Sequence, residues 1–205
     1  MGSSASKEDG SPSPDEDDKR SDSSSCAHYL DHLISIGVRL VVLDFDSTII
    51  DVHTSGRWKE SAKSLSKHVR PVFLALMKAV IEQKGLYLAI ATQSPQTDLI
   101  RKVLKERLPF HHKEIVIKGE DRTWERVDGI PKGGKQQHIE AVKRELDEKC
   151  HVQFSSNEIL LIDDDFINVG IALSYDFKAI TFEKDESIEK ILNLTRESAK
   201  INADK

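Results

Sequence analysis

Short hydrophobic runs alternate along this chain with stretches of helical periodicity. The runs are β-branched and aliphatic, and they have the length of strands that are buried on both faces of a sheet. They lie at residues 39–43, 86–91, 115–117, 159–162 and 179–182. The alternation predicts an α/β fold with three layers, a Rossmann-like, doubly wound architecture around a mostly parallel sheet.

Between these runs, apolar residues recur three or four positions apart, as they do on one face of a helix. Pro71 is suited to the first turn of such a helix, because its missing N–H has no partner there in any case, and Gly85 is suited to its end. The remaining helices are expected over residues 26–36, from about 95 to 107, over 135–149, through 169–173 and over 186–194. Residues 119–134 form a polar loop longer than the usual connection, and loops of this length are often functional.

A chain of 205 residues has room for one α/β domain and a tail. Residues 1–25 consist mainly of Ser, Asp, Glu, Gly and Pro, with almost nothing to bury, so we expect them to be a disordered tail. Residues 26–205 are then a single domain, with a further short tail from about residue 196.

Charge and cysteine usage exclude several classes of function. The net charge is −5, and residues 1–25 contribute −4 of it, so the remainder is close to neutral and has no electrostatic footprint for nucleic acid. The two cysteines, Cys26 and Cys150, have no metal-type spacing, which favours a reducing, cytoplasmic setting. No apolar run approaches the ~20 residues of a membrane helix. The oligomeric state stays open.

The chain starts with a pattern that is typical of N-myristoylation. Gly2 would be the acceptor and Ser6 the required hydroxyl residue. One acyl chain gives only weak peripheral membrane association, and the acidic residues that follow would oppose anionic lipid. The alternative is an unmodified leader that merely begins with Met-Gly.

The first hydrophobic run ends in two carboxylates, Asp44 and Asp46. Residues two apart in an extended chain point the same way, so both side chains should emerge at the carboxyl end of the strand. Ligands bind at this edge of a parallel sheet. Two neighbouring acids repel each other and resist burial, so a divalent cation is expected to offset their charge.

Other chemically active residues follow later strands. Thr92, Gln93 and Ser94 come directly after the second run, and Lys135 opens a helix. Asp163, Asp164 and Asp165 end the fourth run. Because parallel strands end at one edge, these groups can converge there. Hard oxygen ligands without a His/Cys cluster favour Mg²⁺, and a lysine and a hydroxyl nearby suit a phosphoryl group.

Asp44-Phe45-Asp46-Ser47-Thr48, followed in order by Thr92, Lys135 and an acidic strand end, resembles the motifs of the haloacid dehalogenase superfamily over roughly residues 38–182. The resemblance implies a phosphatase in which Asp44 is the nucleophile and forms an aspartyl-phosphate. It implies that Asp46 is the general acid and base. It also implies that Thr92, with Gln93 and Ser94, binds the phosphoryl group and that Lys135 stabilises its charge.

Residues 163–168 are similar to the Asp-Asp-x-x-x-Asn variant of small magnesium-dependent phosphatases. The resemblance makes Asp164 the chief metal ligand beside Asp44, with Asp163 in support and the backbone carbonyl of Asp46 as a further ligand. Asn168 stands where many relatives have an acid. The aspartate two positions after the nucleophile is a feature of phosphatases rather than dehalogenases.

Relatives carry a cap domain in segments that are short in this chain, so the resemblance implies a core with a minimal cap. The open cleft would admit a phosphoprotein or a small phosphate ester, or a partner would close it. The candidates for reading the substrate lie on a flap at 51–58 and on the loop at 119–134, namely His53, Arg57, Trp58, Arg122 and Trp124.

Three alternative functions compete with this interpretation. Gly129 to Gln136 nearly matches a nucleotide-binding P-loop, but Gln136 stands where a Ser or Thr belongs and no buried strand precedes it. A phospho-receiver, or an inactive module that binds phosphorylated partners, has similar residues, but in a receiver the acidic pair precedes the phosphorylated aspartate. Transfer of the phosphoryl group to an acceptor other than water is the third.

Overall fold

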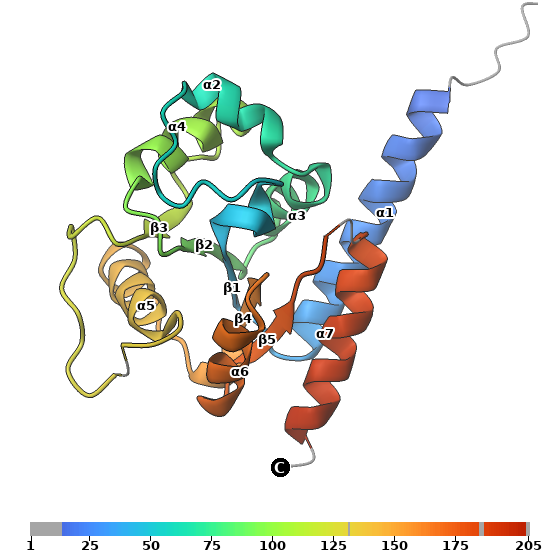
Figure 1. The fold of residues 1–205 in the computed structure, drawn as a ribbon. Helices are drawn as coiled ribbons and strands as arrows, with labels where there is room; N and C mark the ends of the chain where they lie inside the picture. The colour runs from blue at the N-terminus through green and yellow to red at the C-terminus, as the bar shows by residue number, and fades with distance from the viewer. Residues whose placement is uncertain (1–13, 131, 185–186, 204–205) are drawn as a thin grey trace, which may run out of the picture.

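The computed structural model describes residues 14–130, 132–184 and 187–203 of the chain. Five parallel strands form its sheet, in the order β3-β2-β1-β4-β5 (Figure 1). The strands are β1 (Leu40–Leu43), β2 (Tyr87–Ala91), β3 (Val116–Lys118), β4 (Ile159–Asp163) and β5 (Lys178–Thr181). The predicted α/β class and the predicted strands are therefore confirmed, and every strand pair is parallel.

Strand β1 lies at the centre, and the chain order reverses between it and β4. Leu43 at its carboxyl end is level with Ile90 of β2 and with Ile162 of β4. The ends of these three strands therefore meet at one edge, at the point of a doubly wound sheet where ligands bind.

Helices cover both faces of the sheet, which makes three layers (Figure 1). One face is covered by α1 (Pro14–Ser35), α3 (Pro71–Glu82), α4 (Thr97–Arg107) and α7 (Ile188–Ala203). The other is covered by α5 (Gln136–Cys150) and α6 (Phe166–Ser174). A short helix, α2 (Ala62–Leu65), lies beside α4.

The core consists of two hydrophobic layers, one on each side of β1. Val41 and Leu43 belong to the layer under α1, α3, α4 and α7, whereas Leu40 and Val42 belong to the layer under α5 and α6. All four side chains are buried, which explains why this strand reads as a continuous apolar run.

The two chain ends differ from the predicted boundaries. Helix α1 begins at Pro14 rather than near Cys26, so the expected disordered tail does not extend over 14–25. A proline followed by acidic residues is favoured in the first turn of a helix. The polar composition of residues 14–25 instead led to the prediction of a disordered tail. Helix α7 likewise continues to Ala203, past the tail predicted from 196. Gly2 and the rest of 1–13 lie outside the described residues.

In the part of the chain that the structure describes, no helix combines the length and the apolar character needed to cross a membrane.

Candidate active site

The site begins where β1 ends. The backbone N–H of Asp44 donates to the carbonyl of Ile162 at 2.9 Å, so pairing with β4 continues one residue past the strand. The chain then turns tightly over Phe45–Ile49, with Ser47 in the left-handed region at φ 61°. The N–H of Ser47 donates to the carbonyl of Val52 at 3.0 Å. This turn directs the following flap, residues 51–58, back toward the strand end.

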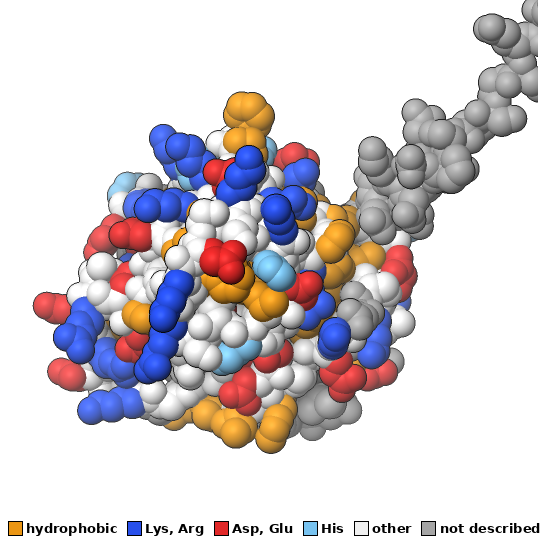
Figure 2. Space-filling model, turned by 45° about the horizontal axis from the view of Figure 1, so that its top comes forward, with side chains coloured by type: hydrophobic (Ala, Val, Ile, Leu, Met, Phe, Trp, Pro, Cys, Tyr) orange, Lys and Arg blue, Asp and Glu red, His pale blue; other side chains and the backbone are white. Residues whose placement is uncertain are grey.

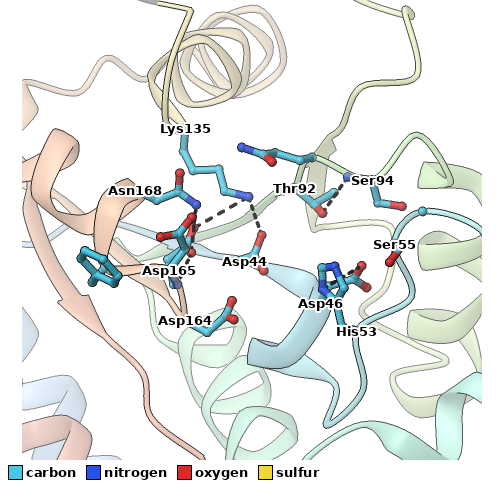
Figure 3. Close-up of a pocket in the computed structure, with 14 residues that line it drawn as sticks. Asp44, Asp46, His53, Ser55, Thr92, Ser94, Lys135, Asp164, Asp165 and Asn168 are labelled. Atoms are coloured by element: carbon cyan, nitrogen blue, oxygen red, sulfur yellow. Dashed lines mark hydrogen bonds and ion pairs between the residues drawn. The ribbon is translucent and has the colours of Figure 1, made fainter.

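Asp44 and Lys135 form the centre of the site. The Nζ of Lys135 lies 2.5 Å from Oδ1 of Asp44 and 3.7 Å from Oδ2 of Asp163 (Figure 3). Asp44, Lys135 and Asp163 are 5%, 2% and 1% exposed, respectively. A buried ammonium between two buried carboxylates is electrostatically paired, but one positive charge does not balance the acids around it.

Asp163 is held in place by its own segment. Its carboxylate accepts from the Asn168 side-chain amide, with both oxygens at 3.1 Å, and from the backbone N–H of Asp165 at 2.9 Å. Asn168 therefore orients the Asp163 carboxylate, whereas an acid at position 168 would repel it.

Carboxylate oxygens of Asp44, Asp163 and Asp164 lie within 4.8 Å of one another. Thr48 fixes the third acid, because its hydroxyl donates to Asp164 Oδ1 at 3.3 Å and accepts from the Asp164 N–H at 3.0 Å. Three hard oxygen donors with excess negative charge fit a magnesium-type cation. The carboxylate of Asp46 is not in this group, and its backbone carbonyl remains a predicted ligand.

Asp46 faces the flap instead. Its two carboxylate oxygens lie 2.9 and 2.8 Å from the donating hydroxyl of Thr54, and its Oδ2 accepts from the Thr54 backbone N–H at 3.2 Å. The Nδ1 of His53 lies 3.9 Å from the same Oδ2. The second acid is thus held apart from the metal-type group and has its own hydrogen-bond donors.

The flap is fastened to the loop after β2. Gln96 exchanges two hydrogen bonds with the backbone of Trp58, at 2.8 and 3.0 Å. Gly56, at φ 64°, packs so closely on Pro95 that a Cβ there would lie 2.5 Å from the proline ring. The flap can therefore follow this path only with glycine at its tip.

The loop after β2 presents Thr92, Gln93 and Ser94 to the site. The Thr92 N–H donates to the carbonyl of Lys118 in β3 at 2.9 Å, and the Ser94 N–H donates to the Thr92 hydroxyl at 3.1 Å. Gly119 permits this packing, since a Cβ would lie 2.4 Å from the Ser94 carbonyl oxygen.

These groups surround one cavity of about 560 Å³ at the carboxyl edge of the sheet (Figure 3). All eight side chains that the sequence assigned to catalysis, phosphoryl binding or metal binding line it. They are Asp44, Asp46, Thr92, Gln93, Ser94, Lys135, Asp163 and Asp164. Residues that are distant in sequence therefore converge as the parallel sheet required.

The predicted substrate-reading residues are only partly brought to this cavity. His53 lines it, whereas Arg57, Trp58, Arg122 and Trp124 do not. Trp124 instead donates its indole N–H to the Gly119 carbonyl at 2.7 Å and packs on the ring of His138. Its position indicates a structural role in the long loop.

Thr54, Ser55 and Phe166 were missed by sequence reasoning. Thr54 binds Asp46, while Ser55 and Phe166 line the cavity. No spacing rule identifies Thr54 or Ser55, because their place depends on the path of the flap. Phe166 had a signal, since an aromatic residue next to three aspartates departs from the helical apolar pattern.

Burial dominates the electrostatics of the central groups. It raises the pKa of the Asp44 carboxyl to about 7, although the Lys135 ammonium acts in the opposite direction, and it also raises the pKa of Asp163. Burial by itself lowers the pKa of Lys135, but the Asp44 and Asp163 carboxylates outweigh it, so the net direction is upward. A cation beside the acids would favour their ionised forms.

No protein-family model matches the chain, and no curated protein matches it either. Among solved structures, it is similar to the HAD domain of the effector protein Lem4 from Legionella pneumophila, with 16% identity over 80% of this chain and 97% of that one, at a TM-score of 0.46.

Two further solved structures are similar. One is the N-terminal part of a Bacteroides fragilis protein, described as containing a phosphatase domain complexed with Mg, with 15% identity over 84% of this chain, 43% of that chain and a TM-score of 0.46. The other is a predicted HAD-like family hydrolase from Porphyromonas gingivalis, with 16% identity over 78% of this chain, 98% of that chain and a TM-score of 0.44. Likenesses of this degree leave the function to be inferred from the site itself.

Proposed function

We propose that this chain is a Mg²⁺-dependent phosphomonoester hydrolase of the haloacid dehalogenase superfamily, acting through an aspartyl-phosphate on Asp44. The observation that carries the proposal is the arrangement around Asp44, whose carboxylate lies 2.5 Å from the Lys135 ammonium and within 4.8 Å of two further acids. The separately held carboxylate of Asp46 lines the same cavity. This combination suits phosphoryl transfer to a carboxylate.

In the first step, a carboxylate oxygen of Asp44 forms a bond to phosphorus while the bond to the leaving oxygen breaks. Lys135 and the hydroxyl of Thr92 neutralise and hold the phosphoryl oxygens. Asp46, in its protonated form, donates its proton to the leaving oxygen. Thr54 orients Asp46 through the hydroxyl and the N–H that contact its carboxylate.

In the second step, Asp46 is a carboxylate and takes a proton from a water molecule, whose oxygen attacks phosphorus. The bond between phosphorus and Asp44 then breaks, which releases phosphate and restores the nucleophile. A bound Mg²⁺, held by Asp44, Asp163 and Asp164, would supply positive charge against the phosphoryl oxygens. Asn168 keeps Asp163 oriented for that role.

The test is hydrolysis of an aryl phosphate with and without Mg²⁺. We expect activity that requires Mg²⁺ and that falls at least about a thousandfold in Asp44→Asn, because the amide cannot act as the nucleophile. Asp51→Asn is the matched control, because Asp51 is an exposed flap carboxylate that pairs with His68 outside the cavity. Acid quenching during turnover of ³²P-labelled substrate should trap the label on Asp44.

Three outcomes would contradict the proposal. Undiminished turnover in Asp44→Asn would remove the covalent mechanism. A long-lived phosphoryl group on Asp44 without turnover would favour the receiver-like alternative. Transfer of label to an added alcohol in preference to water would make the chain a phosphotransferase.

A further inference from the structure

Helix α6 begins with two exposed hydrophobic side chains beside the acidic group. Phe166 is 73% exposed and Ile167 is 56% exposed, although both directly follow Asp165 at the end of the β4 segment. Phe166 also lines the cavity that contains Asp44. Any molecule larger than phosphate that reaches Asp44 through this side of the cavity therefore meets an apolar wall.

This wall is held rigidly with respect to the site. Asp165 caps α6 by accepting from the Ile167 N–H at 2.8 Å, and the Asp165 N–H in turn donates to Asp163 at 2.9 Å. Phe166 is therefore positioned by the same hydrogen bonds that fix a candidate metal ligand. A large apolar side chain that is exposed at such a point gains free energy when a ligand covers it.

The opposite wall of the cavity has a different character. It is formed by the flap, where His53, Ser55 and Gly56 line the cavity and the neighbouring Arg57 and Lys59 are exposed. In Figure 3, Asp44 lies between Asp165 on one side and His53 and Ser55 on the other. Figure 2 shows one face of the molecule, on which hydrophobic, acidic and basic side chains are interspersed.

Resting on the proposed function, we infer that the substrate is a phosphorylated peptide segment with an apolar side chain two residues from the phosphorylated one, bound against Phe166 and the adjacent Ile167. Successive side chains of an extended peptide point to opposite faces, so the residues two positions away, about 6.6 Å along the chain, face the cavity together with the phosphorylated residue. The flap is mixed in charge, with Asp51 and Arg57 both exposed, and it presents the polar side chains of His53 and Ser55 to the cavity. Sugar phosphates would leave Phe166 uncovered.

A membrane lipid is the less suitable ligand for the same pair. Asp164 is exposed next to Phe166, and Asp165 is partly exposed between them. The anionic surface of a bilayer repels carboxylates that must approach it together with the apolar side chains. A single peptide side chain can cover Phe166 without that approach.

The test compares phosphopeptides that differ only at the positions two residues from the phosphorylated one, with Leu on one side, Leu on the other side, or Asn on both. With Mg²⁺, we expect kcat/KM to favour one Leu peptide over the Asn peptide by about tenfold. Phe166→Ser should reduce that ratio to about twofold or less, and Ile167→Ser should reduce it partially, since each removes apolar contact area.

Phe110→Ser is the matched control. Phe110 is 88% exposed after α4 and does not line the cavity, so it removes the same side chain from a surface remote from the site. The Leu preference should persist in this variant. Equal kcat/KM values for the wild-type protein on all three peptides, or a preference that survives Phe166→Ser, would overturn the inference.

Failure of the inference can be separated from failure of the proposed function. Fluorescence anisotropy with Asp44→Asn measures phosphopeptide affinity without turnover, so the Leu preference and its loss in Asp44→Asn/Phe166→Ser are tested even if hydrolysis is absent. Two results together would assign Phe166 and Ile167 to a membrane and overturn the inference. They are binding to vesicles of phosphatidylcholine with phosphatidate that Phe166→Ser abolishes, and the absence of any preference among the peptides. Mg²⁺- and Asp44-dependent hydrolysis without the preference would leave the proposed function intact.

Discussion

The flap and the long loop at 119–134 are both polar segments beside the same sheet edge, and both contact the loop after β2, yet their other attachments differ. The flap binds the catalytic side directly, through Thr54 on Asp46 and through the Trp58 backbone on Gln96. The long loop begins against the loop after β2, where the Glu120 N–H donates to the Ser94 carbonyl at 3.2 Å. Its later part binds α5, where the Gln137 side chain holds the backbone of Val127 and Ile130.

The difference shows that loop length is a poor guide to function and that the hydrogen-bond partners of a loop are a better one. The flap brings three residues to the cavity, whereas none of the described residues at 119–130 and 132–134 lines it. The long loop packs beside the start of α5, which follows Lys135 directly. We therefore expect the flap to affect turnover and the long loop to affect stability.

Mg²⁺ should act directly on the acids of the site, which lie between the two loops. The pKa of Asp44 is raised by burial from 3.8 to about 7 in the folded state. The folded protein therefore retains a proton that the unfolded chain loses, and the free energy of unfolding without metal should fall as pH rises between those values. Mg²⁺ needs the ionised carboxylates, so its stabilising effect should grow over the same interval.

Thermal unfolding at pH 5 and pH 8, with and without Mg²⁺, measures this effect. At a hundredfold excess over its dissociation constant, Mg²⁺ should stabilise the protein by about 2.7 kcal/mol at pH 8 and by clearly less at pH 5. Sodium chloride of equal ionic strength is the control. Equal stabilisation at the two pH values would show that Mg²⁺ binds elsewhere.

Gln137→Leu should break the attachment of the long loop. The Gln137 amide accepts from the Val127 N–H at 2.8 Å and donates to the carbonyls of Val127 and Ile130 at 3.0 and 2.6 Å. Loss of these bonds should lower the free energy of unfolding by about 2 kcal/mol. Turnover of an aryl phosphate should change less than about twofold, because this side chain does not line the cavity.

The matched control for that variant is Gln153→Leu. Gln153 makes a single exposed side-chain bond, to Asp147 at 3.4 Å, so urea unfolding should hardly change. A Gln137→Leu protein that keeps its stability but loses turnover would reverse the roles assigned to the two loops.

Thr54→Val should break the corresponding attachment of the flap. Valine has nearly the same shape but removes the hydroxyl that contacts Asp46 at 2.8 Å. We expect kcat/KM to fall by about tenfold, which corresponds to about 1.4 kcal/mol, because the general acid is no longer oriented. Thr54→Ser keeps the hydroxyl and should retain most activity.

The conservative variant distinguishes orientation of Asp46 from a general structural defect. Thermal unfolding of Thr54→Val should stay close to that of the wild-type protein while its kcat/KM falls. If Thr54→Val and Thr54→Ser lose activity equally, Thr54 has only a structural role.

The convergence of the site residues could be predicted because it depends on sheet topology. Asp44, Thr92 and Asp163 each stand at or directly after the end of a buried hydrophobic run, and parallel strands end at one edge. The position of a residue at the end of a strand can therefore be predicted without knowing how the loops fold.

The contacts made by loops could not be predicted in this way. Thr54 reaches Asp46 only because Ser47 adopts a left-handed conformation that turns the flap back, and no periodicity encodes such a turn. Trp124 resembled a substrate-binding residue, but its indole is satisfied within its own loop. The predicted start of helix α1 was too late, because its first residues are polar and lack apolar periodicity. Its start signals, Pro14 and the acids after it, depend on backbone geometry and charge instead.

The smallest predicted effect concerns two exposed residues, His53 on the flap and Arg122 on the long loop. Both were candidates for reading the substrate, but only His53 lines the cavity, 3.9 Å from Asp46. His53→Ala should raise KM for a phosphopeptide by about threefold, because one rim contact is lost. Arg122→Ala should leave KM and kcat unchanged, since Arg122 does not line the cavity although its charge would suit phosphate.

Steady-state kinetics with the same phosphopeptide measure both variants. A rise in KM for Arg122→Ala that equals or exceeds the rise for His53→Ala would mean that substrate extends over the long loop. One peptide would then contact both segments, so the flap could not be assigned to substrate and the long loop to the stability of α5. The hydrogen-bond partners of a loop would no longer predict whether it contacts the substrate.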